Sequence, residues 1–264
     1  MLKITSQRID VGTPNEEAAA AARALLKELC IADPAEIVLE DIAMTRGVYV
    51  IAGGLFGAEA RLVRGHGRGI VRVKDMPGEL GRKRFAVAHE IGHWVLHDGV
   101  SQLSLCTTED FISYSSSPVE LAANAFAGEL LMPTSLFRPL CKEPDLKLIR
   151  TLAERFNVSW TAASLRFTEE CGQDCAVVFS KGGRVKWFRS SDSKRVFIKP
   201  GTEVSSNRVA RACSTPDEMQ PVNVDVWFPG WYRPGVIRIV QEQSVLLRRY
   251  ETVMTLLWIE DQKL

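Results

Sequence analysis

The chain has 264 residues, of which 46% are hydrophobic and 25% are charged, and its formal net charge at pH 7 is +1. These values are typical of a globular protein with one large domain or two small ones. They exclude a global basic surface of the kind that binds nucleic acids or anionic lipids. No apolar run approaches the roughly 20 residues that span a bilayer, and the first residues lack the apolar core of a signal peptide. We therefore expect a cytoplasmic protein with no membrane partner.

The first half of the chain combines helix signals with a short strand-rich segment. Thr13-Pro14-Asn15-Glu16 and Asp33-Pro34-Ala35-Glu36 each join an N-cap residue, a proline and a glutamate, which is the pattern of a helix start. Apolar stretches separated by glycines predict three short strands between residues 48 and 73. Helical periodicity returns over residues 82 to 98, where Gly99 serves as a stop. A small sheet beside a long helix is the expected arrangement.

Three more helices are expected before the pattern changes again. One runs from Pro118 to Leu131 and ends at a proline, and two shorter ones over residues 145–156 and 159–170 resemble a helix-turn-helix unit. Because this unit has no basic stripe, helix packing explains it better than DNA contact. Beyond Cys171 the pattern is strand-like, and we expect a separate α/β domain over residues 172–264, with strands at 176–180, 184–188, 222–228 and 236–240.

The six cysteines are scattered through a chain that is too large to need disulfide bonds, and most are expected to be small core residues. Cys171 and Cys175 have a CxxxC spacing that would suit half of a zinc site. No second pair of cysteines or histidines follows at a matching spacing, and structural zinc uses four such ligands. The spacing therefore assigns this pair no role.

The segment Phe85-Ala-Val-Ala-His89-Glu90-Ile-Gly-His93-Trp-Val-Leu-His97 carries the clearest chemical signal. Residues four apart lie on one face of a helix, so His89 and His93 can bind one ion, for which zinc is the usual choice. Glu90 follows the first histidine and can take a proton from a water that the metal acidifies. This set of groups is suited to peptide-bond hydrolysis.

Chance is a poor explanation for this segment, although a lone histidine is often just a polar position on an amphipathic helix. Three of the four histidines in the chain fall within nine residues of this helix. Gly92 stands between the paired histidines, where a helix prefers alanine, so a close approach by another group is expected there. The metal interpretation is therefore favoured.

The third metal ligand is not decided by the helix itself. His97 lies eight residues, or about 12 Å of helix rise, from His89, so we expect it to lie behind a metal ligand or on the substrate side rather than to bind the metal. The remaining candidates are Asp98, Glu109, Asp110, Glu120 and Glu129. Glu120 is favoured because Asn124 follows it at i+4, where an amide could orient a ligand. However, Ser117-Pro118-Val119-Glu120 is also a capping box, and local physics leaves the two roles of Glu120 equal.

Two of these motifs together resemble a known family. Residues 84–97, followed by Glu120-Leu-Ala-Ala-Asn-Ala-Phe-Ala-Gly-Glu-Leu-Leu-Met-Pro133, closely resemble the ImmA/IrrE-type metallopeptidases. The resemblance extends to Leu152-Ala-Glu-Arg-Phe-Asn-Val-Ser159 and covers residues 35–170. It implies that His89, His93 and Glu120 bind the metal and that Glu90 is the base, which favours the ligand role of Glu120.

The sequence patterns and the resemblance together predict a fold, a domain plan and a substrate class. The implied fold is α+β: a zincin-like helical core with a small sheet, in a metallopeptidase domain over residues 1–135. A helix-turn-helix-like segment (136–171) and a C-terminal mixed α/β domain (172–264) follow. Some relatives carry a GAF-like sensory domain at this end. Members of the family cleave transcriptional repressors of the helix-turn-helix type and so relieve repression of stress-response or mobile-element genes.

Two other functions remain open at this point. The first is a non-catalytic regulator that binds a DNA-binding partner through the helix-turn-helix-like segment, although such a protein has no need for Glu90. The second is a zinc hydrolase that acts on small molecules. Manganese could replace zinc. Candidates for the group that stabilises the oxyanion are His97, Tyr114 and any arginine near the cleft.

Overall fold

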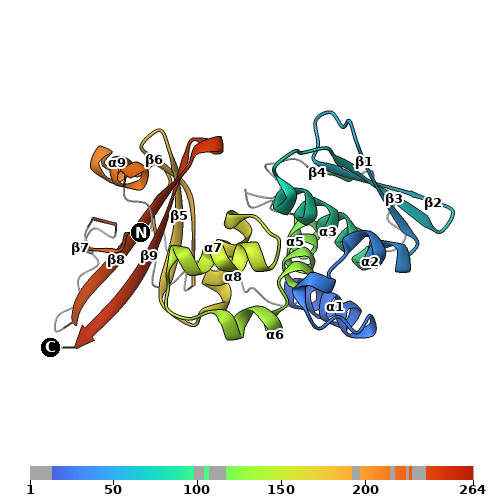
Figure 1. Cartoon of the computed structure of the whole chain (residues 1–264), viewed down its shortest axis with the longest axis horizontal. Coiled ribbons are helices and arrows are strands. Elements are labelled where there is room, and N and C mark those ends of the chain that lie inside the picture. The colour runs from blue at the N-terminus through green and yellow to red at the C-terminus, as the bar shows by residue number, and fades with distance from the viewer. Residues whose placement is uncertain are drawn as a thin grey trace, which may run out of the picture. The chain divides into compact units, whose positions relative to one another are not determined.

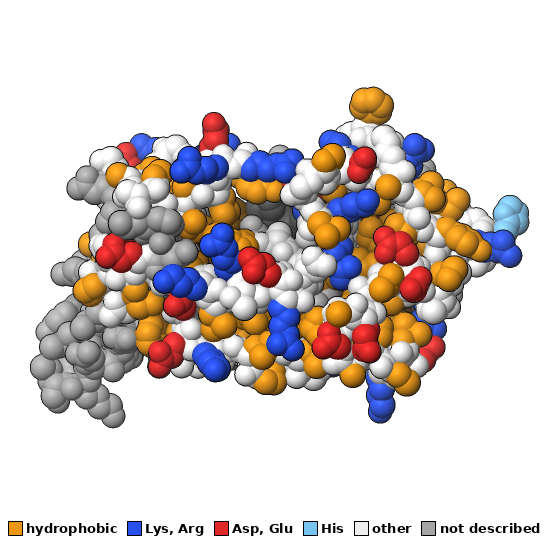
Figure 2. All heavy atoms as spheres, viewed as in Figure 1, with side chains coloured by type: hydrophobic (Ala, Val, Ile, Leu, Met, Phe, Trp, Pro, Cys, Tyr) orange, Lys and Arg blue, Asp and Glu red, His pale blue; other side chains and the backbone are white. Residues whose placement is uncertain are grey.

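The computed structural model describes residues 14–97, 104–106, 117–191, 197–214, 218–223, 226–227 and 236–263. The fold is α+β, as expected, with one four-stranded and one five-stranded sheet (Figure 1). By their contacts the residues form two compact units, Met1–Leu136 with Arg155–Ser159, and Phe137–Glu154 with Trp160–Leu264. Within the described ranges no helix is long and apolar enough to cross a lipid bilayer. Basic and acidic side chains alternate on the face in Figure 2, in keeping with the net charge of +1.

Most helices of the first unit begin and end close to the residues that the sequence indicates. They are α1 (Pro14–Glu28), the 3-10 helix η1 (Pro34–Glu36), α3 (Leu80–Leu96) and α5 (Pro118–Leu131), whereas α2 (Leu39–Thr45) is not expected from the sequence. The Asp33 signal starts η1 rather than a longer helix, and Gly99 lies outside the described residues. Helix α5 packs against both α1 and α3 and ends at Met132-Pro133.

The four-stranded sheet confirms the three strands expected between residues 48 and 73. Strands β1 (Val48–Gly53), β2 (Ala60–Gly65), β3 (Arg68–Lys74) and β4 (Ser104–Cys106) lie in the order β1-β3-β2-β4. Strand β3 alternates strictly between exposed and buried residues, so one face of the sheet is solvated. Val71 and Val73 are fully buried on the other face, and α3 packs against β2 and β3.

Two of the four helices that follow α5 occur close to where they are expected. They are α7 (Leu146–Arg155) and α8 (Trp160–Glu170), whereas α6 (Thr134–Phe137) and the 3-10 helix η2 (Arg138–Leu140) are not expected from the sequence. Between α7 and α8, Asn157 adopts a left-handed conformation with φ +56°. The turn after it lies on the first turn of α3, where a side chain on Gly81 would come within 2.3 Å of the Ser159 nitrogen.

The five-stranded sheet of the second unit contains longer strands than expected. Strands β5 (Cys175–Lys181), β6 (Arg184–Ser190), β7 (Gln220–Asn223), β8 (Val236–Leu247) and β9 (Thr252–Lys263) lie in the order β6-β5-β9-β8-β7. The expected strand over 222–228 is wrong in its extent, because β7 ends at Asn223 and Trp227 lies in a turn. Neither β9 nor α9 (Ser206–Ser214) is expected from the sequence.

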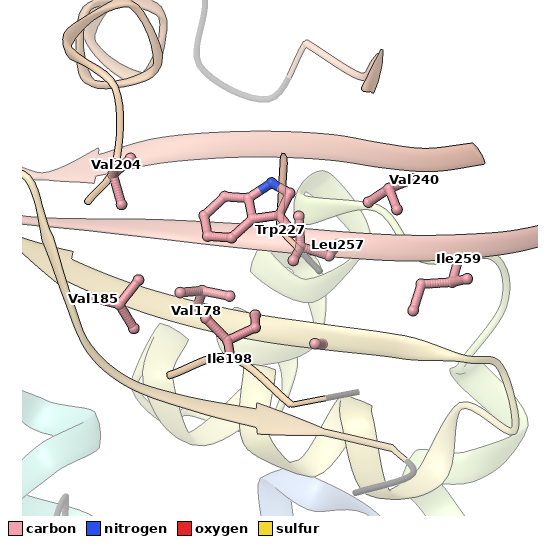
Figure 3. Packing of buried hydrophobic residues seen from close by; sticks show 9 residues of the cluster. Val178, Val185, Ile198, Val204, Trp227, Val240, Leu257 and Ile259 are labelled. Atoms are coloured by element: carbon pink, nitrogen blue, oxygen red, sulfur yellow. The ribbon is translucent and has the colours of Figure 1, made fainter. Parts of the chain in front are cut away.

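One face of this sheet has its own hydrophobic core (Figure 3), which Trp227 covers. The core consists of buried side chains from four strands and the segments between them, namely Ala176, Val178, Val185, Ile198, Val204, Trp227, Val240, Leu257 and Ile259. At its edge Trp227 donates to the buried Glu242 carboxylate over 2.7 Å, and Arg208 pairs with the same carboxylate at 2.8 Å. The second unit thus buries an ion pair beside its apolar core.

Candidate metal centre

Helix α3 carries the His-Glu-x-x-His segment in the interior of the first unit. Every residue from Ala86 to His93 is buried, and Glu90 is 0% exposed. The N-terminal turn is held by Arg82, which forms a two-point ion pair with the buried Glu59. Trp94 near the C-terminal end donates its indole N–H to the Arg46 carbonyl over 2.9 Å. The helix is therefore fixed at both ends by residues outside it.

Helix α5 crosses α3 at Gly92, the glycine between the two histidines. A Cβ at this position would lie 3.1 Å from the Phe126 ring, 3.2 Å from the Ala123 carbonyl oxygen and 3.3 Å from the Ala123 Cα. The close approach expected at Gly92 is thus made by α5. One turn before this contact, α5 carries Glu120.

His89, His93 and Glu120 come together between the two helices. The Nε2 atoms of the two histidines are 2.9 Å apart, and Glu120 oxygens lie 3.0 Å from His89 Nε2 and 3.4 Å from His93 Nε2. Hydrogen bonds with His89 and then His93 hold the pKa of the Glu120 carboxyl well below its usual range, against the effect of burial. In the part of the chain that the structure describes, this is the only group of three such residues suited to a metal ion.

The donor atoms fit a tetrahedral ion. Ligands about 2.0–2.1 Å from zinc at tetrahedral angles lie about 3.3–3.4 Å apart, close to the three separations found here. Two imidazole nitrogens that face each other at 2.9 Å need a proton or a cation between them. Two imidazoles and one carboxylate are also the ligand chemistry of catalytic zinc sites. A fourth position would be left for water or substrate.

Asn124 lies where it can orient the first histidine. Its side-chain oxygen is 2.8 Å from His89 Nδ1. An amide oxygen only accepts, so this contact assigns the proton to Nδ1 and leaves the lone pair on Nε2, the atom that faces His93 and Glu120. The amide thus selects the tautomer that can bind a metal.

The other candidates for the third ligand have different surroundings or are not described. The Glu129 carboxylate accepts hydrogen bonds from the Thr134 backbone N–H at 3.0 Å and from the Thr134 hydroxyl at 2.8 Å. It therefore holds the junction between α5 and α6. Tyr114 and three of the ligand candidates, Asp98, Glu109 and Asp110, lie outside the described residues.

His97 lies next to the group of three without joining it. Its ring centre is 5.8 Å from that of His93, and it occupies the C-cap of α3. Burial and the neighbouring His93 lower the pKa of His97, so its ring is neutral at pH 7. A neutral ring beside the centre is able to donate or accept a proton.

The two roles considered for Glu120 can be compared with a capping box elsewhere in the chain. At the start of η1, Glu36 bonds back to the Asp33 backbone N–H at 2.9 Å while the Asp33 side chain caps Ala35, so both halves of the box are present. At the start of α5 the Ser117 side chain makes no capping hydrogen bond, and the Glu120 carboxylate faces the histidines instead.

Arg64 is a residue at this centre that the sequence does not single out. Its guanidinium donates to the His93 backbone carbonyl and lies 4.6 Å from the centre of the Trp94 ring. It thereby caps the end of α3 with a positive charge and ties it to β2. The only sequence signal is its position in β2, two residues after the buried Leu62, which directs it to the covered face of the sheet.

The fold and this group of side chains define a candidate metal centre of the metallopeptidase kind. Residues 46–168 match the family model Peptidase_M78, described as the IrrE N-terminal-like domain. This match agrees with the family resemblance seen in the sequence and covers just under half of the length of the chain.

The chain also resembles a solved structure, a Mycobacterium tuberculosis transcriptional regulator, with 18% sequence identity and a TM-score of 0.55. The similarity covers 94% of this chain and 90% of that protein, and at this identity it supports the fold alone. None of the curated proteins that were compared with the chain matches it.

Proposed function

We propose that the chain is a zinc-dependent endopeptidase that cleaves a transcriptional repressor of the helix-turn-helix type in the cytoplasm. The observation that carries the proposal is the convergence of His89, His93 and Glu120, whose donor atoms all lie within 4.8 Å of one another. The IrrE N-terminal-like domain supports the peptidase class and the repressor as substrate. The fold neighbour named as a transcriptional regulator agrees with a role in gene control.

Each side chain has a role that follows from its position. His89, His93 and Glu120 would hold zinc, or manganese in its place, and the bound ion would supply Lewis-acid activation of water and of the substrate carbonyl. Glu90 follows His89 in a fully buried turn of α3, and its carboxylate acts as the base that accepts a proton from the attacking water. Asn124 keeps His89 in the required tautomer, and His97, whose ring lies next to that of His93, assists on the substrate side. Tyr114 stays a candidate for the same role from the sequence alone.

The base is tested with Glu90→Gln, which keeps the size of the side chain but cannot take up a proton. Purified, metal-loaded protein is incubated with candidate helix-turn-helix repressors from the same organism, and cleavage is followed by electrophoresis and mass spectrometry. We expect the wild type to cut at one bond and the variant to bind metal normally without cutting. Cleavage by Glu90→Gln at the wild-type rate would refute the mechanism. Stable binding of the repressor without cleavage by the wild type would instead favour the non-catalytic regulator.

The ligand set is tested with the pair Glu120→Ala and Glu129→Ala. Both remove a carboxylate from α5, but only Glu120 faces the histidines, while Glu129 bonds to Thr134. We expect elemental analysis to find zinc in the Glu129 variant and little in the Glu120 variant, with circular dichroism as a check on folding. Loss of zinc from the Glu129 variant alone would contradict the assignment.

The second unit, with its own core and five-stranded sheet, is proposed to regulate this activity. If the second unit is a sensor, its deletion should change how cleavage of the repressor depends on a signal. The deletion would leave the metal ligands in place, because all of them belong to the first unit.

A further inference from the structure

Two thiols of the second unit lie in contact, although their spacing in the sequence indicates no function. Cys171 follows the last turn of α8, Cys175 is the first residue of β5, and their sulfur atoms are 3.3 Å apart in a hydrogen bond. Neither thiol takes part in the metal centre, whose ligands belong to the other unit. The pair therefore needs an explanation of its own.

The backbone on each side of the pair is fixed. The Cys171 N–H still bonds to the Phe167 carbonyl of α8 at 2.9 Å, and Gly172 then reverses the chain with φ +66°. On the other side the Asp174 carbonyl accepts from Ile259 at 2.9 Å, and Cys175 pairs with Trp258 of β9. The turn thus holds the two thiols facing each other across three intervening residues.

Ser191 adds a second constraint on Cys175. The Cys175 N–H donates to the Ser191 hydroxyl at 3.0 Å, and the Cys175 carbonyl accepts from the Ser191 N–H at 2.9 Å. The Cys175 side chain is fully buried, whereas Cys171 is partly exposed. A small oxidant in solution therefore reaches Cys171 first.

The contact also divides the chemical roles between the two sulfurs. The hydrogen bond from Cys175 lowers the pKa of Cys171 to about 7 in spite of its burial. The same bond, together with burial, raises the pKa of the Cys175 thiol. At neutral pH a larger fraction of Cys171 is therefore thiolate than of a thiol with the usual pKa of about 8.5.

We propose that Cys171 and Cys175 are a reversible oxidation site, at which hydrogen peroxide produces a disulfide bond. The Cys171 thiolate attacks one peroxide oxygen, the O–O bond breaks, and the departing hydroxide takes up a proton to leave as water. The Cys175 sulfur then attacks the resulting sulfenic sulfur, the S–O bond breaks, and a second water leaves with the thiol proton. The two thiols lose two electrons and the peroxide gains them, while a dithiol reductant reverses the reaction.

The geometry requires only a small movement for this step. The sulfur atoms need to approach from 3.3 Å to about 2.05 Å for the bond to form. Among the described residues, Cys141 is a competing thiol that the Cys171 charge affects. Burial above all, and then that charge, raise the pKa of Cys141 to about 12, so it stays a neutral thiol. We therefore expect Cys175, and not Cys141, to resolve the sulfenic acid.

The test uses the full chain and reads peptide mass rather than activity. Trypsin releases Phe167–Lys181, a single peptide that contains both cysteines. After brief treatment with peroxide and alkylation of the remaining thiols, we expect this peptide to carry no alkyl group and to weigh two hydrogen atoms less than the unalkylated dithiol form. Because its pKa is lowered, Cys171 should react faster at pH 7 than the exposed Cys30 and Cys213.

Three variants separate this proposal from its alternatives. Cys171→Ser should prevent the disulfide, Cys175→Ser should stop at a sulfenic acid that dimedone traps on Cys171, and Cys141→Ser should behave as the wild type. A wild-type peptide that remains alkylated at both cysteines while Cys30 is oxidised would overturn the proposal. A disulfide that links Cys171 to Cys141 would overturn it as well. Because both outcomes are read on the wild type, they do not depend on the folding of the variants.

Discussion

Gly92 provides a direct test of how the two helices position the metal ligands. In Gly92→Ala the new methyl group would meet the Phe126 ring and the Ala123 backbone at 3.1–3.3 Å, closer than ordinary van der Waals contact. Because two of the three neighbouring atoms belong to the α5 backbone, the helix itself has to move by a few tenths of an ångström. Glu120 lies one turn away on the same helix and would move with it.

The expected size of the effect follows from two opposing contributions to stability. Alanine gains about 1 kcal/mol over glycine as a helix former, while overpacking a tight contact costs about 1–3 kcal/mol. We expect Gly92→Ala to lower the free energy of unfolding by between about 0 and 2 kcal/mol. Its zinc affinity, measured by competition with a chromophoric chelator, should fall about 10- to 100-fold, as when a group that orients metal ligands is lost.

Gly128→Ala is the matched control, because it makes the same change within α5 where a Cβ would meet nothing within 4 Å. This variant should gain up to about 1 kcal/mol of stability and bind zinc as the wild type does. If Gly92→Ala also becomes more stable and keeps full zinc affinity, the close approach of α3 and α5 does not determine the geometry of the site.

Three further predictions concern the metal, its support and the second unit. Removal of the metal by a chelator should lower the melting temperature by about 5–10 °C, since a ligand at 100 times its Kd contributes about 2.7 kcal/mol; an unchanged melting temperature would argue against a bound metal. Arg64→Ala removes a hydrogen bond to the end of α3 and should weaken zinc binding about tenfold, whereas the exposed Arg68→Ala should not. Glu242→Ala leaves the Arg208 guanidinium buried without its carboxylate and should destabilise the chain by about 3–5 kcal/mol, measured by urea unfolding, without loss of zinc.

The parts of the fold that local chemistry determines could be predicted from the sequence. Proline at the first helical position places the start of α5 at Pro118, and Met132-Pro133 places its end. The i, i+4 spacing similarly predicts that His89 and His93 face one ion, and their nitrogens lie 2.9 Å apart. In both cases the deciding residues are close together along the chain.

Glu120 shows where local chemistry is insufficient. A capping box and a metal ligand need the same residue type at the same helical position, and the Asp33 to Glu36 segment proves that this chain uses the motif as a cap. Which role applies depends on what faces the carboxylate, and for Glu120 that is His89, 31 residues away in the sequence. Only the packing of α5 on α3 brings the two together.

The C-terminal sheet was harder to predict for a different reason. Strand β9 lies in the middle of the sheet between β5 and β8, with side chains buried on both faces, so its sequence lacks the alternation of a half-exposed strand. The second half of β8 begins with Gln241-Glu-Gln-Ser244, which resembles a turn. In the structure both Glu242 and Gln243 are buried. Glu242 forms an ion pair with Arg208, and the Gln243 side-chain oxygen accepts a hydrogen bond from the Leu146 backbone N–H. The strand can therefore include buried polar residues, because residues distant in the sequence provide their hydrogen-bond and ion-pair partners.

The extent of the family match has a physical basis in the way α3 is held. The proposed ligands span only residues 89–120, yet the match runs from 46 to 168. Arg46 supplies the carbonyl that binds Trp94 near the C-terminal end of α3. At the other end, the backbone of Val158 and Ser159 lies so close to Gly81 that any side chain there would clash. The helix that carries His89, Glu90 and His93 is thus fixed by residues near both limits of the matched segment, so a shorter segment would contain the ligands without the contacts that hold them in place.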